Sequence, residues 1–102
     1  MVRHIILWTL KDTFGEEEKK EIKKNAKEHL EGLYGKVPSL RRIAVHTDPL
    51  PSSNCDMMLE SAFDDEQGLK DYAVHPAHVA VANEFVRPFT CSRVCLDFED
   101  AQ

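Results

Sequence analysis

Apolar and polar residues alternate with a period of two in four segments of the chain: 2–10, 40–47, 55–63 and 91–99. Such alternation is typical of β-strands, because successive side chains point to opposite faces of a sheet. The first segment carries apolar residues on both faces, with Ile6 and Trp8 on one and Ile5 and Leu7 on the other. It therefore predicts a strand that is covered on both sides.

A helical period of three and four residues replaces the alternation between the first two strands. The apolar stripe of this segment is formed by Ile22, Ala26, Leu30 and Leu33. It predicts a helix over about 14–34. Thr13 and Glu16 have the spacing of a capping box, which predicts where the helix begins. Gly35 predicts its end.

Two further helical segments separate the third and fourth strands. Acidic residues open the first of them at 64–66, where they suit the positive end of a helix running to about Val74. Pro76 predicts a second start, because proline fits the first position of a helix. The apolar stripe of that piece is Ala77, Val81, Phe85 and Val86, and Pro88 ends it.

The resulting order is strand, helix, strand, strand, helix, strand. This βαββαβ order predicts an α+β, ferredoxin-like domain over 1–102, with a four-stranded antiparallel sheet and helices on one face. The candidates for the other face of the sheet are Leu7, Met57 and Leu96. Whichever of them point to that face would be exposed to solvent in a single chain. A bare apolar face predicts an interface. We therefore expect a homodimer through the sheet face, a dimeric α+β barrel.

The composition is that of an ordinary globular domain, with 42% hydrophobic and 30% charged residues. The 13 basic and 18 acidic residues leave a net charge of −5, which disfavours binding to nucleic acid and to anionic membranes. No apolar stretch has the length of a membrane span, and the N-terminus does not resemble a signal peptide, so we expect a cytoplasmic location. The three cysteines lack CxxC spacing and are expected to be reduced thiols. Scattered arginines such as Arg93 could steer an acidic ligand, although they are more often a solvated rim.

Three side chains that can transfer or bind protons lie within the seven residues Tyr72-Ala-Val-His75-Pro76-Ala-His78. A histidine can act as a general base near neutral pH without strong tuning. A tyrosine hydroxyl can donate a hydrogen bond to an oxygen that becomes negative. This segment is therefore where we expect a functional site.

The same segment resembles a known family. Val2–Trp8 looks like the opening strand of the stress-responsive A/B barrel domain, Dabb, and the run from Cys55 through His78 is similar to its most recognisable segment. Ser92–Glu99 is similar to its closing strand. The resemblance covers nearly the whole chain and implies a dimeric α+β barrel, in agreement with the strand and helix order.

The resemblance implies less about activity, because most members of the family have no assigned reaction. A few are polyketide cyclases that use a Tyr and a His of this motif as an acid–base pair. At the matching positions this chain has Tyr72 and His78, with His4 as a pocket neighbour, so the resemblance implies Tyr72 and His78 as the candidate catalytic residues. The candidate ligand contacts are His4, His75 and Trp8. We therefore expect a protein of uncharacterised role that binds a small apolar carbonyl compound between sheet and helices. The alternatives are a cofactor-free cyclase or isomerase and a cofactor-free monooxygenase. We expect no cofactor.

Structural roles and metal binding are the competing interpretations of these residues. Tyr72 could pack at the end of its helix, His75 could cap the next helix, and His78 could be a hydrogen-bonded core histidine. His75 and His78 could share a metal if Asp71, His4 or His46 supplied a further ligand. No second spaced pair of ligands exists in the sequence, so we assign no metal site.

Overall fold

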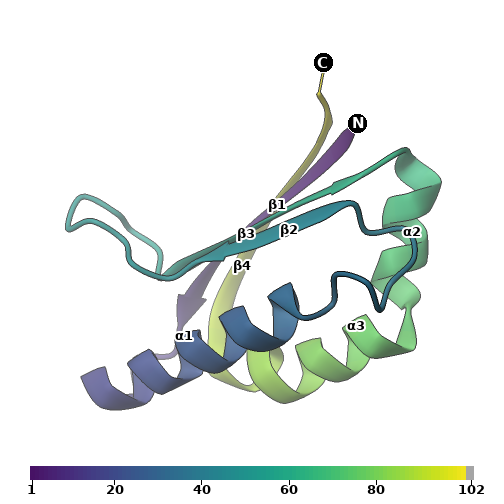
Figure 1. Cartoon of the computed structure of the whole chain (residues 1–102). Helices are drawn as coiled ribbons and strands as arrows, with labels where there is room; N and C mark the ends of the chain where they lie inside the picture. The colour runs from purple at the N-terminus through teal and green to yellow at the C-terminus, as the bar shows by residue number, and fades with distance from the viewer. Residues whose placement is uncertain (101–102) are drawn as a thin grey trace.

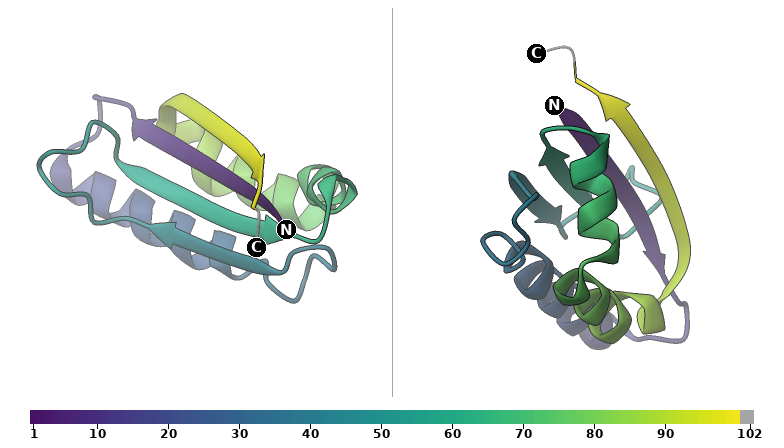
Figure 2. Two further views of the ribbon diagram at one scale, coloured as in Figure 1. Left: turned by 90° about the horizontal axis from the view of Figure 1, so that it is seen from above. Right: turned by 90° about the vertical axis from the view of Figure 1, so that its right-hand side faces the viewer.

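Four strands form one antiparallel sheet in the order β2-β3-β1-β4, and the helices pack on one of its faces (Figures 1 and 2). The computed structural model describes residues 1–100. The elements are β1 (Val2–Leu10), α1 (Glu16–Glu31), β2 (Arg42–His46), β3 (Met57–Phe63), α2 (Glu66–Val74), α3 (Pro76–Val81), the π-helical turn η1 (Ala82–Val86), the 3₁₀ turn η2 (Arg87–Phe89) and β4 (Thr90–Glu99). The predicted ferredoxin-like βαββαβ fold is confirmed. No helix of this part of the chain has the length and apolar character needed to cross a membrane.

The strand β1 runs through the centre of the sheet and has two different faces. Its inner side chains are buried, from Val2 to Leu10 in steps of two. Its outer residues Ile5 and Leu7 are half-buried and lie opposite Leu96 and Val94 of the edge strand β4. The predicted division of this strand into two apolar faces is confirmed.

The outer face of the sheet is the side away from the helices, and no element of the described residues covers it. Leu96 is 62% exposed and Val94 58% exposed on this face. Of the three candidates for the bare face, Met57 does not belong to it, because it pairs with Trp8 and is 2% exposed on the inner side. The direction of its side chain depends on the register of β3 against β1, which the sequence does not determine.

The helix α1 begins later than the Thr13 capping box predicted. Gly15 is the N-cap, and the Glu18 carboxylate accepts a hydrogen bond from the Gly15 backbone N–H at 3.0 Å. Only the Glu half of a capping box is therefore present, two residues later than predicted, because glycine has no side chain that could cap the helix. The helix also ends early, with Gly32 as its C-cap. Gly35 lies in the turn that follows, where its φ of 91° is a conformation that favours glycine.

The break between α2 and α3 places the Tyr-His segment. The Asp65 carboxylate caps α2 by accepting a hydrogen bond from the Gly68 N–H at 2.8 Å. At the other end His75 is extended, and Pro76 then starts α3 as predicted. The following turn η1 closes with a hydrogen bond from the Arg87 N–H to the Ala82 carbonyl, five residues back. Single π-helical turns of this kind often occur at functional sites.

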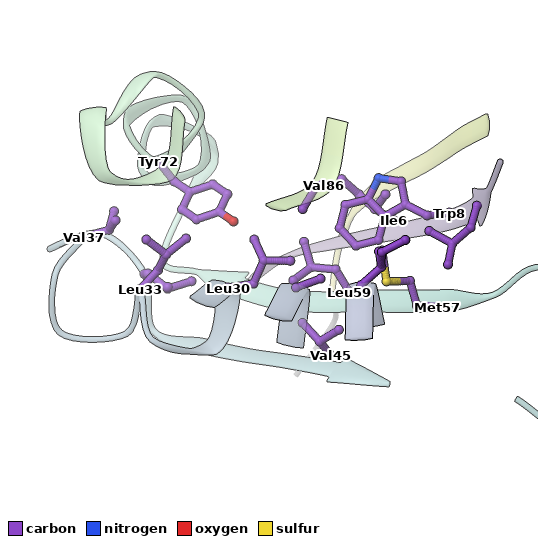
Figure 3. Close-up of a cluster of buried hydrophobic side chains, with 14 of the residues drawn as sticks. Ile6, Trp8, Leu30, Leu33, Val37, Val45, Met57, Leu59, Tyr72 and Val86 are labelled. Atoms are coloured by element: carbon purple, nitrogen blue, oxygen red, sulfur yellow. The ribbon is translucent and has the colours of Figure 1, made fainter. Parts of the chain in front are cut away.

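The core lies between the inner face of the sheet, α1 and the last turn of α2 (Figure 3). Leu59 of β3 is 2% exposed, and Leu30 and Leu33 of α1 pack into the same cluster. Each fully buried side chain of this size contributes about 1.5–3 kcal/mol relative to an exposed one. The inner face is therefore stabilised within a single chain.

Candidate functional site

A cavity of about 190 Å³ lies between the inner face of the sheet and the helices α2 and α3. Four of the five residues proposed from the sequence line it: His4, Trp8, Tyr72 and His78. The cavity adjoins a wider groove between α2 and β4, because His4, Leu69, Ala73 and Arg93 line both. The structure therefore brings most of the predicted site into one enclosed space with an open side.

Tyr72 forms one wall of the cavity from the last turn of α2. Its ring is 1% exposed and packs 5.2 Å from the Phe63 ring, measured between centroids. Figure 3 shows the ring pointing away from its helix toward the buried side chains of the sheet and α1. Among residues 1–100 the hydroxyl has no hydrogen-bond partner. Burial raises the pKa of Tyr72, so the hydroxyl stays protonated and can donate.

His78 lies against Tyr72 on α3. The two ring centroids are 4.2 Å apart. The His78 Nδ1 is 3.2 Å from the Ala73 carbonyl oxygen. Because a carbonyl oxygen only accepts hydrogen bonds, Nδ1 carries the hydrogen of a neutral ring and Nε2 keeps a free lone pair. This is the tautomer that a general base needs.

The surroundings of His78 keep its imidazole neutral. Burial lowers the pKa of His78, and the positive charges of Arg87 and Arg93 lower it further. The hydrogen bond to the Ala73 carbonyl partly opposes this change. The ring is thus available as a proton acceptor at physiological pH.

His4 closes the other side of Tyr72 from β1. The centroids of the His4 and Tyr72 rings are 6.3 Å apart, in an edge-to-face arrangement. His4 lies directly opposite Asp97 in the pairing of β1 with β4, and its Nδ1 hydrogen-bonds the Asp97 carboxylate. An aspartate in this position fixes the tautomer and the orientation of the imidazole, leaving Nε2 as an acceptor.

The sequence analysis missed Asp97. The alternation of the last strand placed Cys95 and Asp97 on one face, opposite Val94 and Leu96. The pairing with His4 depends on the register of two strands that are far apart in the sequence. Nothing in the sequence gives that register, so no signal could have identified this partner.

A metal would find its ligands at this pair rather than in the motif. The His4 Nδ1, the Cys95 Sγ and an Asp97 oxygen all lie within 4.8 Å of one another, with the sulfur 3.8 Å from the nitrogen. Imidazole, thiolate and carboxylate are zinc ligands. Burial and the Asp97 carboxylate raise the pKa of Cys95, so a metal would first have to displace the thiol proton. The hydrogen bond between His4 and Asp97 accounts for the arrangement without a metal.

His75 is the predicted site residue that the structure separates from the cavity. Its Nδ1 accepts a hydrogen bond from the Ala77 N–H at 3.1 Å and so caps α3. The ring lines a different, shallow groove with Val37 and Pro38. The capping interpretation of His75 is confirmed. A metal shared by His75 and His78 is not favoured, because the two side chains line different hollows and the group of three possible ligands found within residues 1–100 contains neither of them.

Trp8 serves both the core and the cavity. It is 5% exposed and belongs to the main hydrophobic cluster, where it packs on the inner face of the sheet. It also lines the cavity wall, together with Ile6. A ligand in this space would meet apolar side chains from both the sheet and the helices, together with the polar groups of His4, Tyr72 and His78.

Comparison with known proteins agrees with the fold. Residues 2–100 match the family model described as the stress responsive A/B barrel domain. An uncharacterised protein of Streptomyces coelicolor is 34% identical over 90 residues, which cover 83% of this chain and 90% of the relative. Because this relative is itself uncharacterised, the similarity assigns no activity to the chain.

Two crystal structures of proteins of unknown function have the same architecture. A dimeric protein with a ferredoxin-like fold from Bacteroides fragilis superposes with a TM-score of 0.90 at 35% identity, covering 97% of this chain and 95% of the other. A dimeric ferredoxin-like protein from Thermobifida fusca gives a TM-score of 0.79 at 28% identity, covering 95% and 88%. Both similarities extend over nearly the full length of each chain.

Proposed function

The chain belongs to the stress-responsive A/B barrel domain family, and on that premise we propose that it is a homodimer whose cavity binds a small, largely apolar carbonyl compound. The observation that carries this proposal is the Tyr72 hydroxyl, which is buried at the cavity without a partner among residues 1–100. A buried hydroxyl without a hydrogen bond is destabilising by about 1–3 kcal/mol. A ligand carbonyl oxygen would accept its hydrogen and remove that cost.

The size of the cavity sets the size of the ligand. A cavity of about 150 Å³ is sufficient for a molecule as large as benzene. The volume of about 190 Å³ therefore suits a compound with one ring and a short substituent. The apolar side chains of Ile6 and Trp8 would hold the ring, and the open side toward β4 would admit a longer substituent.

Tyr72 and His78 can also perform chemistry on such a ligand. The His78 Nε2 removes a proton from the carbon next to the carbonyl, and the electron pair of that C–H bond forms an enolate. The enolate oxygen accepts the hydrogen bond of Tyr72, whose hydroxyl stays protonated. Where the enolate is conjugated with a further double bond, return of the proton from His78 to the distal carbon isomerises the ligand. Attack of the enolate carbon on a second carbonyl closes a ring, and the proton on His78 then passes to the alkoxide that forms.

His4 supports this reaction from the sheet. Its imidazole is held by Asp97 and faces Tyr72 across the cavity. Tyr72 thus lies between two imidazoles, one on α3 and one on β1. We assign His4 as a second acceptor at the ligand and Asp97 as its positioning residue.

The homodimer forms through the outer face of the sheet. The exposed side chains of Val94 and Leu96, together with Ile5 and Leu7 beside them, form the apolar surface that a second copy would cover. The relatives from Bacteroides fragilis and Thermobifida fusca are described as dimeric, at 35% and 28% identity. The relatives support a homodimer, and the exposed apolar side chains support this face as its interface.

Binding is tested by calorimetric titration with acetophenone and with ethylbenzene, which differ in the carbonyl group. We expect acetophenone to bind about three- to tenfold more tightly, because one neutral hydrogen bond contributes about 0.5–1.5 kcal/mol. Tyr72→Phe should abolish this preference. Tyr34→Phe, a change at a tyrosine that is 63% exposed, should retain it. Equal affinities for the two probes in the wild-type protein would refute the proposed binding mode.

Catalysis is tested separately by hydrogen exchange at the carbon next to the acetophenone carbonyl. In deuterated water, NMR should show the methyl protons exchanging faster with the protein than with buffer. His78→Gln should remove the acceleration. His75→Asn is the matched control, because asparagine is also a good N-cap and position 75 lies outside the cavity. Binding without accelerated exchange would identify a ligand-binding protein rather than an enzyme.

A further inference from the structure

Two arginines from the consecutive elements η2 and β4 line the cavity. Arg87 begins η2, and Arg93 lies on β4 among the residues of its inner face. Both line the cavity, and both side chains are exposed. Their guanidinium groups are therefore accessible to whatever occupies the entrance.

These two arginines differ from Arg3 and Arg41 in their partners. Arg3 contacts Glu60 at 3.4 Å, and Arg41 contacts Asp64 at 2.8 Å. Neither Arg87 nor Arg93 forms an ion pair within residues 1–100. The chain carries more acidic than basic residues, so carboxylates are plentiful elsewhere on its surface.

Local structure holds one of these arginines in place. The Arg87 Nη1 donates to the Asn83 Oδ1 at 2.5 Å, from one turn earlier in the chain. The π-helical hydrogen bond between Arg87 and Ala82 brings the buried Val86 and the neighbouring Arg87 together onto the cavity. Arginine presents five N–H donors, so most of those of Arg87 remain available after this contact.

The nearest carboxylate of β4 is already engaged. Asp97 accepts the hydrogen bond of His4 rather than one from an arginine. The positive charges of Arg87 and Arg93 both lower the pKa of His78 and so disfavour protonation of its ring. The cavity lining thus carries two positively charged arginines and no carboxylate among residues 1–100, whereas the adjoining groove is lined by Asp65, Glu66, Asp97 and Glu99 as well as Arg93 and Lys70.

We propose that the ligand carries a carboxylate group, which Arg87 and Arg93 bind at the mouth of the cavity while its carbonyl group reaches Tyr72. The ligand class is a small keto acid with one apolar ring. This inference rests on the proposed function, because it assumes that the cavity is the binding site. Charge-assisted hydrogen bonds to guanidinium groups are about twice as strong as neutral ones, so they would dominate the choice of ligand.

The test compares phenylglyoxylate with 1-phenylpropane-1,2-dione, in which an acetyl group replaces the carboxylate. Calorimetric titration of the wild-type protein should show at least about tenfold tighter binding of the acid. Arg93→Gln and Arg87→Gln should each weaken binding of the acid about tenfold and leave binding of the dione unchanged. Lys24→Gln is the matched control, because Lys24 is an exposed residue of α1 outside the cavity.

A second measurement does not depend on how the variants fold. In the wild-type protein, NMR titration should give His78 a higher pKa in the complex with the acid than in the complex with the dione. The bound carboxylate offsets the charges of Arg87 and Arg93, whereas Tyr72 and His4 face the ring in both complexes. Equal pKa values would overturn the inference.

The remaining outcomes separate this inference from the proposed function. Equal affinity for the two probes, or unchanged acid binding in both arginine variants, overturns the carboxylate but leaves Tyr72-dependent binding of the dione intact. Failure of both probes and of acetophenone to bind overturns the proposed function together with the inference.

Discussion

Leu59 and Leu96 are leucines of the same sheet, but Leu59 is 2% exposed on the inner face and Leu96 is 62% exposed on the outer face. The inner face is covered by α1 and α2 and encloses the cavity, whereas nothing within residues 1–100 covers the outer face. The comparison shows that an alternating strand pattern identifies two apolar faces of a sheet. It does not show which of the two is covered by helices of the same chain. It also separates two kinds of stability, one internal to the chain and one that depends on a second copy.

Replacing the same residue type on the two faces gives the largest expected effects. Leu59→Ala should lower the free energy of unfolding by about 2–5 kcal/mol, because it leaves a cavity in a packed core. Leu96→Ala should act mainly on association, so its loss of stability should grow as the protein is diluted. Urea unfolding at two protein concentrations measures both effects. A concentration-independent loss for Leu96→Ala would contradict the proposed role of the outer face.

A charge on the outer face sharpens the same contrast. Leu96→Glu should dissociate the dimer, because a carboxylate in an apolar interface loses its hydration without gaining a partner. Light scattering coupled to size exclusion should show the mass falling toward the 11.7 kDa of one chain. Lys24→Glu, on the exposed side of α1, should leave the mass unchanged. A wild-type protein that is already monomeric would refute the dimer outright.

On the inner face, the site residue Tyr72 should itself be a source of instability. Tyr72→Phe should raise the free energy of unfolding by about 1 kcal/mol or more in the absence of ligand, because it removes a buried hydroxyl without a partner while keeping the ring. Thermal unfolding measures the change. Tyr34→Phe should have almost no effect, since Tyr34 is mostly exposed. A loss of stability in Tyr72→Phe would indicate that the hydroxyl already has a structural partner.

The smallest effect concerns pH and again belongs to the inner face. The pKa of His78 is lowered by burial below its usual value of 6.5, so the unfolded chain binds the proton more readily than the folded one. The stability associated with a neutral His78 is therefore complete above about pH 6.5 and decreases as the pH falls toward the pKa of the folded state. His78→Gln should flatten the stability profile in this window. An unchanged profile would show that other groups control it.

The fold was largely predictable because its signals are local. Alternation along β1, the acidic opening of α2 and the proline at position 76 each determine a structure within a few residues. The N-terminus of α1 was misplaced because Thr13 and Gly15 both precede plausible helix starts, and the Glu18 carboxylate favours Gly15. The π-helical turn at Ala82–Val86 has no sequence signature.

The site was predictable only in the part that lies on one short segment. Tyr72 and His78 are close in sequence and are brought together by the break at Pro76. Asp97 reaches His4 through strand pairing over more than ninety residues, and the arginines reach the cavity through η2 and β4. These contacts depend on strand register and on a helical irregularity, which are properties of the folded chain as a whole.

The edge strand β4 carries the proposed interface and the rim of the cavity on alternate residues. Val94 and Leu96 face outward, and Arg93 and Asp97 face the groove, so one backbone serves both. Covering one side of this strand would restrict the motion of the other. Ligand binding in the cavity and dimerisation would then be thermodynamically linked. If dimerisation raised the affinity for an effector at the rim, that effector would raise the affinity of the subunits for each other by the same factor.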